Sequence, residues 1–231
     1  MGEAGMSETL YDTTEALDIA LAESVMTTLC EGVTERGTAT LVVSGGSTPK
    51  GLFNLLSARP GPWDAITITL ADERWVPLDH KDSNEAMVRR ELLRDHAATA
   101  KFVSLAPAFP DLDGNITRVC EQLDQLPHYD LVLLGMGGDM HTASLFPCSP
   151  ELGEGMSTQA AALMTRPRSA PHARVSQSLK RLLATRRGIV HLVGKDKLDV
   201  LASAQALSNP MAAPISAFIQ PAGPFEIWAS R

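Results

Sequence analysis

Residues 38–58 read TATLVVSGGSTPKGLFNLLSA: an apolar β-branched run, a glycine-rich loop and an amphipathic segment, in that order. The run at 38–43 predicts a strand, because β-branched side chains pack well on a pleated sheet. Pro49 suits the first position of a helix, where a backbone N–H has no intrahelical partner in any case. The stretch therefore predicts a strand that passes through a short loop into a helix.

The same alternation continues along the rest of the chain. Apolar residues at helical spacing predict a helix from about residue 14 to Gly37, with Thr13 or Thr14 as its N-cap. Near-continuous apolar strands alternating with helices favour an α/β fold, a mainly parallel sheet with helices on both faces. Further strands are predicted at 65–72, 101–106, 129–135, 160–165, 173–179, 187–194 and 225–230, and further helices at 83–97, 115–126 and 195–207.

The length of 231 residues fits one large α/β domain or two small ones. No internal repeat, low-complexity segment or long Pro/Gly/Ser linker divides the chain. We therefore expect a flexible N-terminus at residues 1–12, followed by a single α/β domain at residues 13–231.

Charge and composition argue against several partners and locations. The net charge of −7 argues against a nucleic-acid or anionic-membrane surface, because such surfaces need clustered positive charge. Three cysteines without CxxC spacing favour a reduced cytoplasm. Residues 1–12 contain no basic or apolar leader region, so no signal peptide is expected. No membrane span is expected either, because no run approaches about 18 apolar residues.

Three unusual loops directly follow predicted strands. They are VSGGSTP at 43–49, ADERWVP at 71–77 and GMGGDMHTASLFP at 135–147. In sheets of this kind, ligands bind beyond the carboxyl ends of the strands. The three loops are therefore expected to share one edge of the sheet and to form a site there.

The first loop has the pattern of an anion-binding site. Free backbone N–H groups and the helix dipole point at such a loop, and glycines let the backbone approach a ligand. Pro49 before Lys50 excludes a Walker A loop, and the S-x-x-K match at 47–50 lacks the companion motifs of the serine β-lactamases. A plain tight turn is the alternative. The residues expected to bind phosphate or carboxylate are Ser44, Gly45, Gly46, Ser47 and Thr48.

The second loop begins with the charged residues Asp72, Glu73 and Arg74. Such a cluster often forms an ion-paired structural corner. Beside an anion-binding loop, however, the fork-shaped guanidinium of Arg74 is also a donor for a phosphate or a carbonyl oxygen.

The glycines of the third loop free the chain to make a sharp loop that presents Asp139 and His141. Met140 stands where a dinucleotide-binding G-x-G-x-x-G would need its last glycine, so that interpretation is rejected. An adjacent acid can orient a histidine as a general base. The segment holds no G-x-S-x-G nucleophile elbow, and the absence of HxH and HExxH spacing leads us to expect no metal.

The order of these motifs resembles the 6-phosphogluconolactonases of the pentose phosphate pathway. SGGSTP, DERWVPLDHKDSN, GMGGDMHTASLFP, HARVSQS and VGKDK follow one another between residues 44 and 197. The family's third motif usually reads G-x-G-x-D-G-H-x-A-S-L-F-P, and this chain departs from it only at Met140. The resemblance implies a Rossmann-like fold of the sugar-phosphate isomerase, deaminase and lactonase type.

The resemblance also implies hydrolysis of 6-phospho-D-glucono-1,5-lactone to 6-phospho-D-gluconate by a cytoplasmic carboxylic ester hydrolase. The enzyme would need neither organic cofactor nor metal, and would be a monomer or a weak homodimer. His141 would activate water, held by Asp139, and the oxyanion donor would be Arg74 or loop amides near Gly137 and Gly138. The phosphate would be held by the first loop together with Arg174 and Lys195. Lys50, His80 and Asn84 are further candidates for the pocket wall, without an assigned role.

Two other functions remain open. Deaminases of the same superfamily continue their third motif as A-F-N-E-P, whereas residues 144–147 here read SLFP and hold no carboxylate. This difference favours the lactonase over a deaminase or isomerase. A non-catalytic sugar-phosphate sensor is the other alternative, and it would require Met140 to have disabled the third loop.

Overall fold

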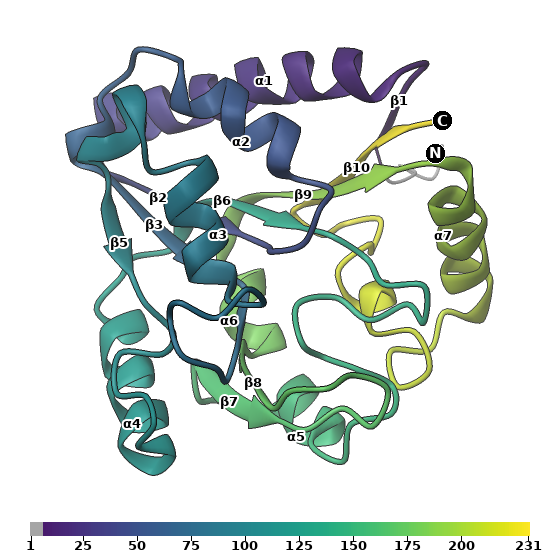
Figure 1. Cartoon of the computed structure of the whole chain (residues 1–231). Coiled ribbons are helices and arrows are strands. Elements are labelled where there is room, and N and C mark those ends of the chain that lie inside the picture. The colour runs from purple at the N-terminus through teal and green to yellow at the C-terminus, as the bar shows by residue number, and fades with distance from the viewer. Residues whose placement is uncertain (1–6) are drawn as a thin grey trace.

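A seven-stranded sheet forms the centre of the computed structural model, which describes residues 7–231 (Figure 1). Every neighbouring pair of strands in this sheet is parallel. The predicted α/β fold is therefore confirmed. In spatial order the strands are β1 (Glu8–Tyr11), β10 (Phe225–Ser230), β9 (Thr185–Val193), β6 (Tyr129–Leu134), β2 (Ala39–Val43), β3 (Ile66–Leu70) and β5 (Lys101–Val103).

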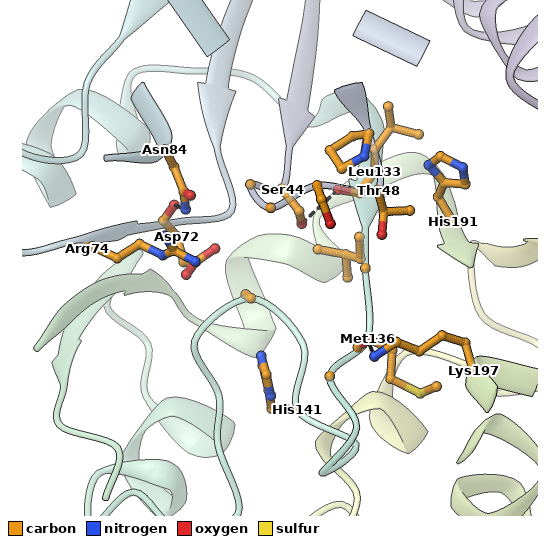
Figure 2. A pocket seen from close by; sticks show the side chains of 18 of the residues that line it. Ser44, Thr48, Asp72, Arg74, Asn84, Leu133, Met136, His141, His191 and Lys197 are labelled. Carbon is orange, nitrogen blue, oxygen red and sulfur yellow. Dashed lines mark hydrogen bonds between the residues drawn. The ribbon is translucent and has the colours of Figure 1, made fainter. Parts of the chain in front are cut away.

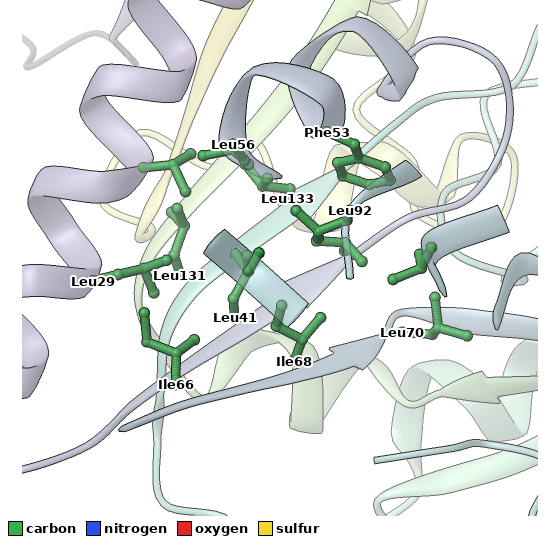
Figure 3. Packing of buried hydrophobic residues seen from close by; sticks show 14 of the residues in the cluster. Leu29, Leu41, Phe53, Leu56, Ile66, Ile68, Leu70, Leu92, Leu131 and Leu133 are labelled. Carbon is green, nitrogen blue, oxygen red and sulfur yellow. The ribbon is translucent and has the colours of Figure 1, made fainter. Parts of the chain in front are cut away.

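Helices cover both faces of the sheet, as alternate side chains of β2 show. Leu41 and Val43 pack in one hydrophobic cluster with α1 (Thr14–Arg36) and α2 (Lys50–Ser57), and Figure 3 shows Leu41 within it. Val42 packs in a second cluster with α7 (Lys195–Leu207). A strand buried on both faces needs apolar side chains at every position, which explains the continuous apolar runs. The helices are α1 (Thr14–Arg36), α2 (Lys50–Ser57), α3 (Asn84–Glu91), α4 (Leu112–Asp124), α5 (Leu152–Ser157), α6 (Leu179–Leu183) and α7 (Lys195–Leu207), with 3₁₀ turns at Trp63–Ala65, Asp95–Thr99 and Pro214–Ala217.

The local signals at the helix ends act as predicted for α1. The Thr13 hydroxyl accepts a hydrogen bond from the Ala16 amide, and Gly37 ends the helix with φ 77°. Helix α3 is shorter than predicted: it ends at Glu91, and the backbone is extended at Arg94 before the 3₁₀ turn Asp95–Thr99 begins. None of the helices in residues 7–231 has the length and apolar character needed to cross a membrane.

A second, three-stranded sheet departs from the predicted single sheet. Strands β4 (Asp72–Arg74), β8 (Arg174–Gln177) and β7 (Ala162–Thr165) form it with antiparallel pairing. Ala71 links the two sheets, because its amide donates to the Val43 carbonyl and its own carbonyl accepts from the Gln177 amide. The chain thus leaves the main sheet one residue after β3 and carries Arg74 into the small sheet.

Within the N-terminal segment that was expected to be flexible, Glu8–Tyr11 form β1 at the edge of the main sheet. Strand β1 pairs with the C-terminal strand β10, and its backbone hydrogen bonds order a segment whose side chains are only partly buried. The sequence carried no signal for this pairing, because the strand is short and its partner lies at the other end of the chain. Residues 1–6 of that segment lie outside the described residues.

Candidate active site

A cavity of about 300 Å³ lies where the three loops meet, beyond the carboxyl ends of β2 and β6 (Figure 2). The predicted meeting of these loops is therefore confirmed. In Figure 2, Arg74 and Asp72 lie on one side of the cavity, Lys197 lies on the opposite side, and His141 lies below them. The predicted residues that line it are Ser44, Gly45, Gly46, Ser47, Thr48, Arg74, Asn84, Gly137, His141 and Arg174. The singled-out residues outside the lining are Lys50, His80, Gly138, Asp139 and Lys195.

The glycine-rich loop at 44–48 has the geometry that its composition predicts. Gly46 has φ 94°, a conformation that favours glycine. A Cβ on Gly45 would lie 1.9 Å from Asn84 Oδ1, so only glycine lets α3 approach so closely. Asn84 Nδ2 in turn donates to the Asp72 carbonyl at 2.9 Å. The first loop, the second loop and the start of α3 therefore form one packed wall of the cavity.

Within the charged second loop, Glu73 has a structural position. Its buried carboxylate accepts hydrogen bonds from the amides of Asn84 and Glu85, both at 2.7 Å, and from the Ser83 hydroxyl at 3.0 Å. Burial raises the pKa of Glu73, while these hydrogen bonds oppose the shift. Glu73 thus holds the N-terminus of α3 against β4 and leaves Asp72 and Arg74 to line the cavity.

Arg74 and Arg174 stand directly opposite each other in the antiparallel pair β4–β8. Like charges in such positions destabilise a sheet. Neither Arg174 Nη1 nor Arg74 Nε, both buried, has a hydrogen-bond partner within residues 7–231, and burial lowers the pKa of the Arg174 guanidinium. The charges of Asp72 and Asp139 oppose this shift, whereas the charge of Arg74 adds to it. Each guanidinium group therefore keeps a buried donor nitrogen without a hydrogen-bond partner, which is costly unless a further group accepts from it.

His141 is held in place by its loop. Its Nδ1 forms a short hydrogen bond with Asp139 Oδ1, and this bond holds the pKa of Asp139 below its usual value. The imidazole also stacks on Phe146, with ring centroids 3.8 Å apart. A Cβ on Gly137 would lie 2.1 Å from His141 Nδ1, so glycine is required there. Asp139 thus supports the ring from outside the cavity, and His141 Nε2 is the nitrogen left for chemistry.

The backbone amide of Gly137 is one of the groups predicted to stabilise an oxyanion, but it already forms a hydrogen bond within the loop. It donates to the His141 carbonyl at 2.9 Å. Gly138 is exposed and lies outside the cavity lining. The Gly137 amide is therefore engaged within the loop, while stabilisation of an oxyanion by the neighbouring loop amides or by Arg74 stays a prediction.

Met140 occupies the glycine position of the family motif with φ 65°, in the left-handed region. This conformation explains why glycine suits the position. The Met140 side chain packs against the second hydrophobic cluster, and its carbonyl accepts from the Ile215 amide at 3.1 Å. It does not line the cavity, so the methionine neither crowds the site nor unfolds the loop.

Lys197, rather than the predicted Lys195, brings a cation to the cavity. Lys195 is the exposed first residue of α7, whereas Lys197 lines the cavity and its Nζ donates to the Met136 carbonyl at 2.9 Å. Residues two apart on a helix point about 200° apart, so only one lysine of the pair can face inward. The sequence did not show which one, because VGKDK contains both.

His191 is a cavity residue that the sequence analysis missed. The available signal was a lone histidine inside the apolar strand RGIVHLVG. Its Nε2 lies 3.5 Å from Asp18 Oδ1, and neither atom forms a hydrogen bond within residues 7–231. Burial raises the pKa of Asp18 to about 6 and lowers the pKa of His191 to about 4.

The Asp18→Asn variant is expected to be more stable than the wild type near neutral pH. The pKa of Asp18 is about 6 in the folded protein and 3.8 ordinarily, so the folded state binds this proton more tightly than the unfolded state. The resulting contribution to the free energy of unfolding is fully present below pH 3.8 and is lost as the pH rises through 6. The gain in unfolding free energy should be about 2–3 kcal/mol at pH 7.5 and smaller at pH 4.5. Urea unfolding at both pH values measures it, with the exposed Asp199→Asn as control. A gain independent of pH would contradict the assignment.

Comparisons with known proteins agree with this geometry. The family model described as glucosamine-6-phosphate isomerases/6-phosphogluconolactonase matches residues 12–228. The 6-phosphogluconolactonase of Pseudomonas aeruginosa is 40% identical over 87% of this chain and 85% of its own, and that of Rhizobium meliloti is 36% identical over 95% and 97%. A crystal structure of a 6-phosphogluconolactonase from Shewanella baltica superposes with a TM-score of 0.95, at 42% identity and 98% coverage of both chains. The chain therefore belongs to the glucosamine-6-phosphate isomerase/6-phosphogluconolactonase family.

Proposed function

We propose that this protein hydrolyses 6-phospho-D-glucono-1,5-lactone to 6-phospho-D-gluconate, the oxidative-branch step of the pentose phosphate pathway. One observation carries the proposal: the cavity holds a histidine oriented by an acid together with two facing arginines, each with a buried nitrogen that has no hydrogen-bond partner within residues 7–231. A base and an anion-binding group in one cavity suit a neutral ester that carries a phosphate. The lactonase names of relatives at 36–40% identity support the same substrate.

His141 acts as the general base in this proposal. Because His141 Nδ1–H donates a hydrogen bond to the Asp139 carboxylate, the lone pair of Nε2 is free to accept a proton from water. The water oxygen forms a bond to the lactone carbonyl carbon as its proton moves to Nε2. The tetrahedral oxyanion then collapses, the bond from carbon to the ring oxygen breaks, and the Nε2 proton moves to that oxygen. One imidazole serves both half-reactions and ends neutral.

The phosphate dianion binds to the cations that the fold gathers in the cavity. Arg174, Arg74 and Lys197 line it, and the loop at 44–48 offers backbone N–H groups. Arg74 Nη1 already donates a hydrogen bond to the Asp82 carbonyl, so the Arg174 guanidinium has more donors left for the phosphate. Binding energy from this remote group positions the carbonyl against the water. A protein of net charge −7 thus holds a dianion by local concentration of positive charge.

The Met140→Gly variant separates the hydrolase from the non-catalytic sensor. Because the Met140 side chain packs outside the cavity, its removal should change kcat by roughly twofold or less, as for substitutions remote from a site. The sensor interpretation instead requires glycine to create or strongly raise activity. Steady-state kinetics on the two proteins decides between them.

The direct test of the function is decay of the lactone in the presence of the purified protein. Glucose-6-phosphate dehydrogenase generates the lactone in the cuvette, and its loss is compared with spontaneous hydrolysis. The expected rate rises in proportion to protein concentration. Absence of acceleration, together with saturable binding of 6-phosphogluconate, would contradict hydrolysis and favour the sensor.

We further infer that the protein works in the cytoplasm as a monomer or weak homodimer, on a small-molecule substrate. Its three cysteines are free, as is usual in a reducing compartment. Light scattering at micromolar concentration should give the monomer mass or a concentration-dependent average, and a stable higher oligomer would contradict the inference.

A further inference from the structure

A second cluster of ligating side chains lies outside the cavity lining. It consists of His80, Asp82 and His172, whose ligand atoms all lie within 4.8 Å of one another. His172 Nε2 is 3.0 Å and His80 Nδ1 is 3.8 Å from Asp82 Oδ2. All three side chains are partly exposed, which leaves the cluster open to solvent.

Two imidazoles and one carboxylate form a donor set for zinc and similar divalent transition metals. Bonds of about 2.0–2.2 Å in a tetrahedral site place neighbouring ligand atoms about 3.4 Å apart. The observed distances of 3.0 and 3.8 Å lie on either side of that value. Magnesium and calcium prefer all-oxygen sites and do not suit two ring nitrogens. Exposure leaves the fourth position for water.

Metal binding must replace contacts that the cluster makes without it. The Asp82 amide donates to His80 Nδ1 at 3.1 Å, so coordination at that nitrogen releases one backbone hydrogen bond. This loop is exposed enough for water to take over the released amide. The His172–Asp82 contact brings two of the ligands together before the metal arrives.

The cluster joins the two segments that carry the cavity arginines. The Asp82 carbonyl accepts from Arg74 Nη1 at 2.7 Å. On the other segment, His172 precedes Ala173, whose carbonyl accepts from the Trp75 amide at 2.8 Å, and Arg174 follows directly. A cation bound here would therefore tie the loop after β4 to the segment before β8.

We propose that His80, Asp82 and His172 bind one Zn²⁺-like cation, which fastens these two segments and so holds Arg74 and Arg174 in register. The site is structural and adds no step to hydrolysis. Metal binding stands independently of the proposed function, whereas the effect on substrate affinity rests on it.

Calorimetric titration of chelator-treated, untagged protein with ZnCl₂ tests the site. The wild type should bind one Zn²⁺ per chain, and its unfolding temperature should rise with Zn²⁺ concentration. His172→Ala and His80→Ala should each weaken Zn²⁺ binding by at least about tenfold. Loss of a group that only orients a metal ligand already lowers metal affinity by about this factor, and each of these variants loses a ligand itself. The matched control is His128→Ala, an exposed histidine outside the cluster, which should bind as the wild type does. Equal titration of all four proteins would overturn the proposal.

Kinetics with and without stoichiometric Zn²⁺ test the link to the arginines. In the wild type, Zn²⁺ should lower KM for the lactone with little change in kcat, and His172→Ala should lose this response. An unchanged KM would overturn the link even if the titration shows binding. If the protein proves not to hydrolyse the lactone, the titration and unfolding measurements still decide the metal site.

Discussion

Replacing His141 with alanine is expected to lower kcat by about 10²–10⁴-fold, the usual contribution of a positioned general base. The ring lines the cavity, its Nδ1 is held by Asp139, and the variant leaves no other group at that position to accept the proton from water. Binding of 6-phosphogluconate should stay within roughly several-fold, because the arginines remain. The measurements are kcat from lactone decay and Kd from calorimetry.

Gly137→Ala is the companion variant for this prediction, since it keeps the histidine and disturbs only its position. The added methyl group would lie 2.1 Å from His141 Nδ1 and 2.7 Å from Asp139 Oδ1, so the pair must separate. A loss of kcat in the same direction as His141→Ala is expected. The exposed His96→Ala serves as control and should keep the wild-type rate. Near-native turnover in His141→Ala would remove the residue from the mechanism.

Arg174→Ala is expected to raise KM by about 10–100-fold, because hydrogen bonds to a charged group contribute about 1.5–3 kcal/mol. The turnover number should fall less, since the phosphate lies away from the reacting bond. Arg174 is buried, and its Nη1 has no partner within residues 7–231. Removal of this cation also relieves its repulsion with Arg74, so the fold should survive the change. Steady-state kinetics gives the split between KM and kcat.

The two lysines of VGKDK provide the matched comparison for Arg174. Lys197→Ala should raise KM because its ammonium lines the cavity, whereas Lys195→Ala should not, because that residue is exposed and outside the lining. An unchanged KM in Arg174→Ala would remove this residue from the phosphate site. A raised KM in Lys195→Ala alone would reverse the assignment of the two lysines.

Local sequence patterns determined much of the fold and of the candidate site. Helix α7 and strand β10 have the bounds that periodicity predicted, and Thr13 and Gly37 end α1 as expected. These features were predictable because burial and backbone conformation depend on neighbouring residues. The meeting of the three loops was predictable as well, because parallel strands place their carboxyl ends at one edge.

Contacts between distant segments were decided only by the tertiary structure. The pairing of Arg74 with Arg174 depends on the second, three-stranded sheet. The local sequences of its strands do not indicate which sheet each strand joins. The inward turn of Lys197 and the burial of Asp18 beside His191 depend on which helix face packs against the sheet. Strand β1 exists because β10 offers it a free edge. Such pairings follow from packing and backbone hydrogen bonds across the whole chain, and no local pattern of side chains encodes them.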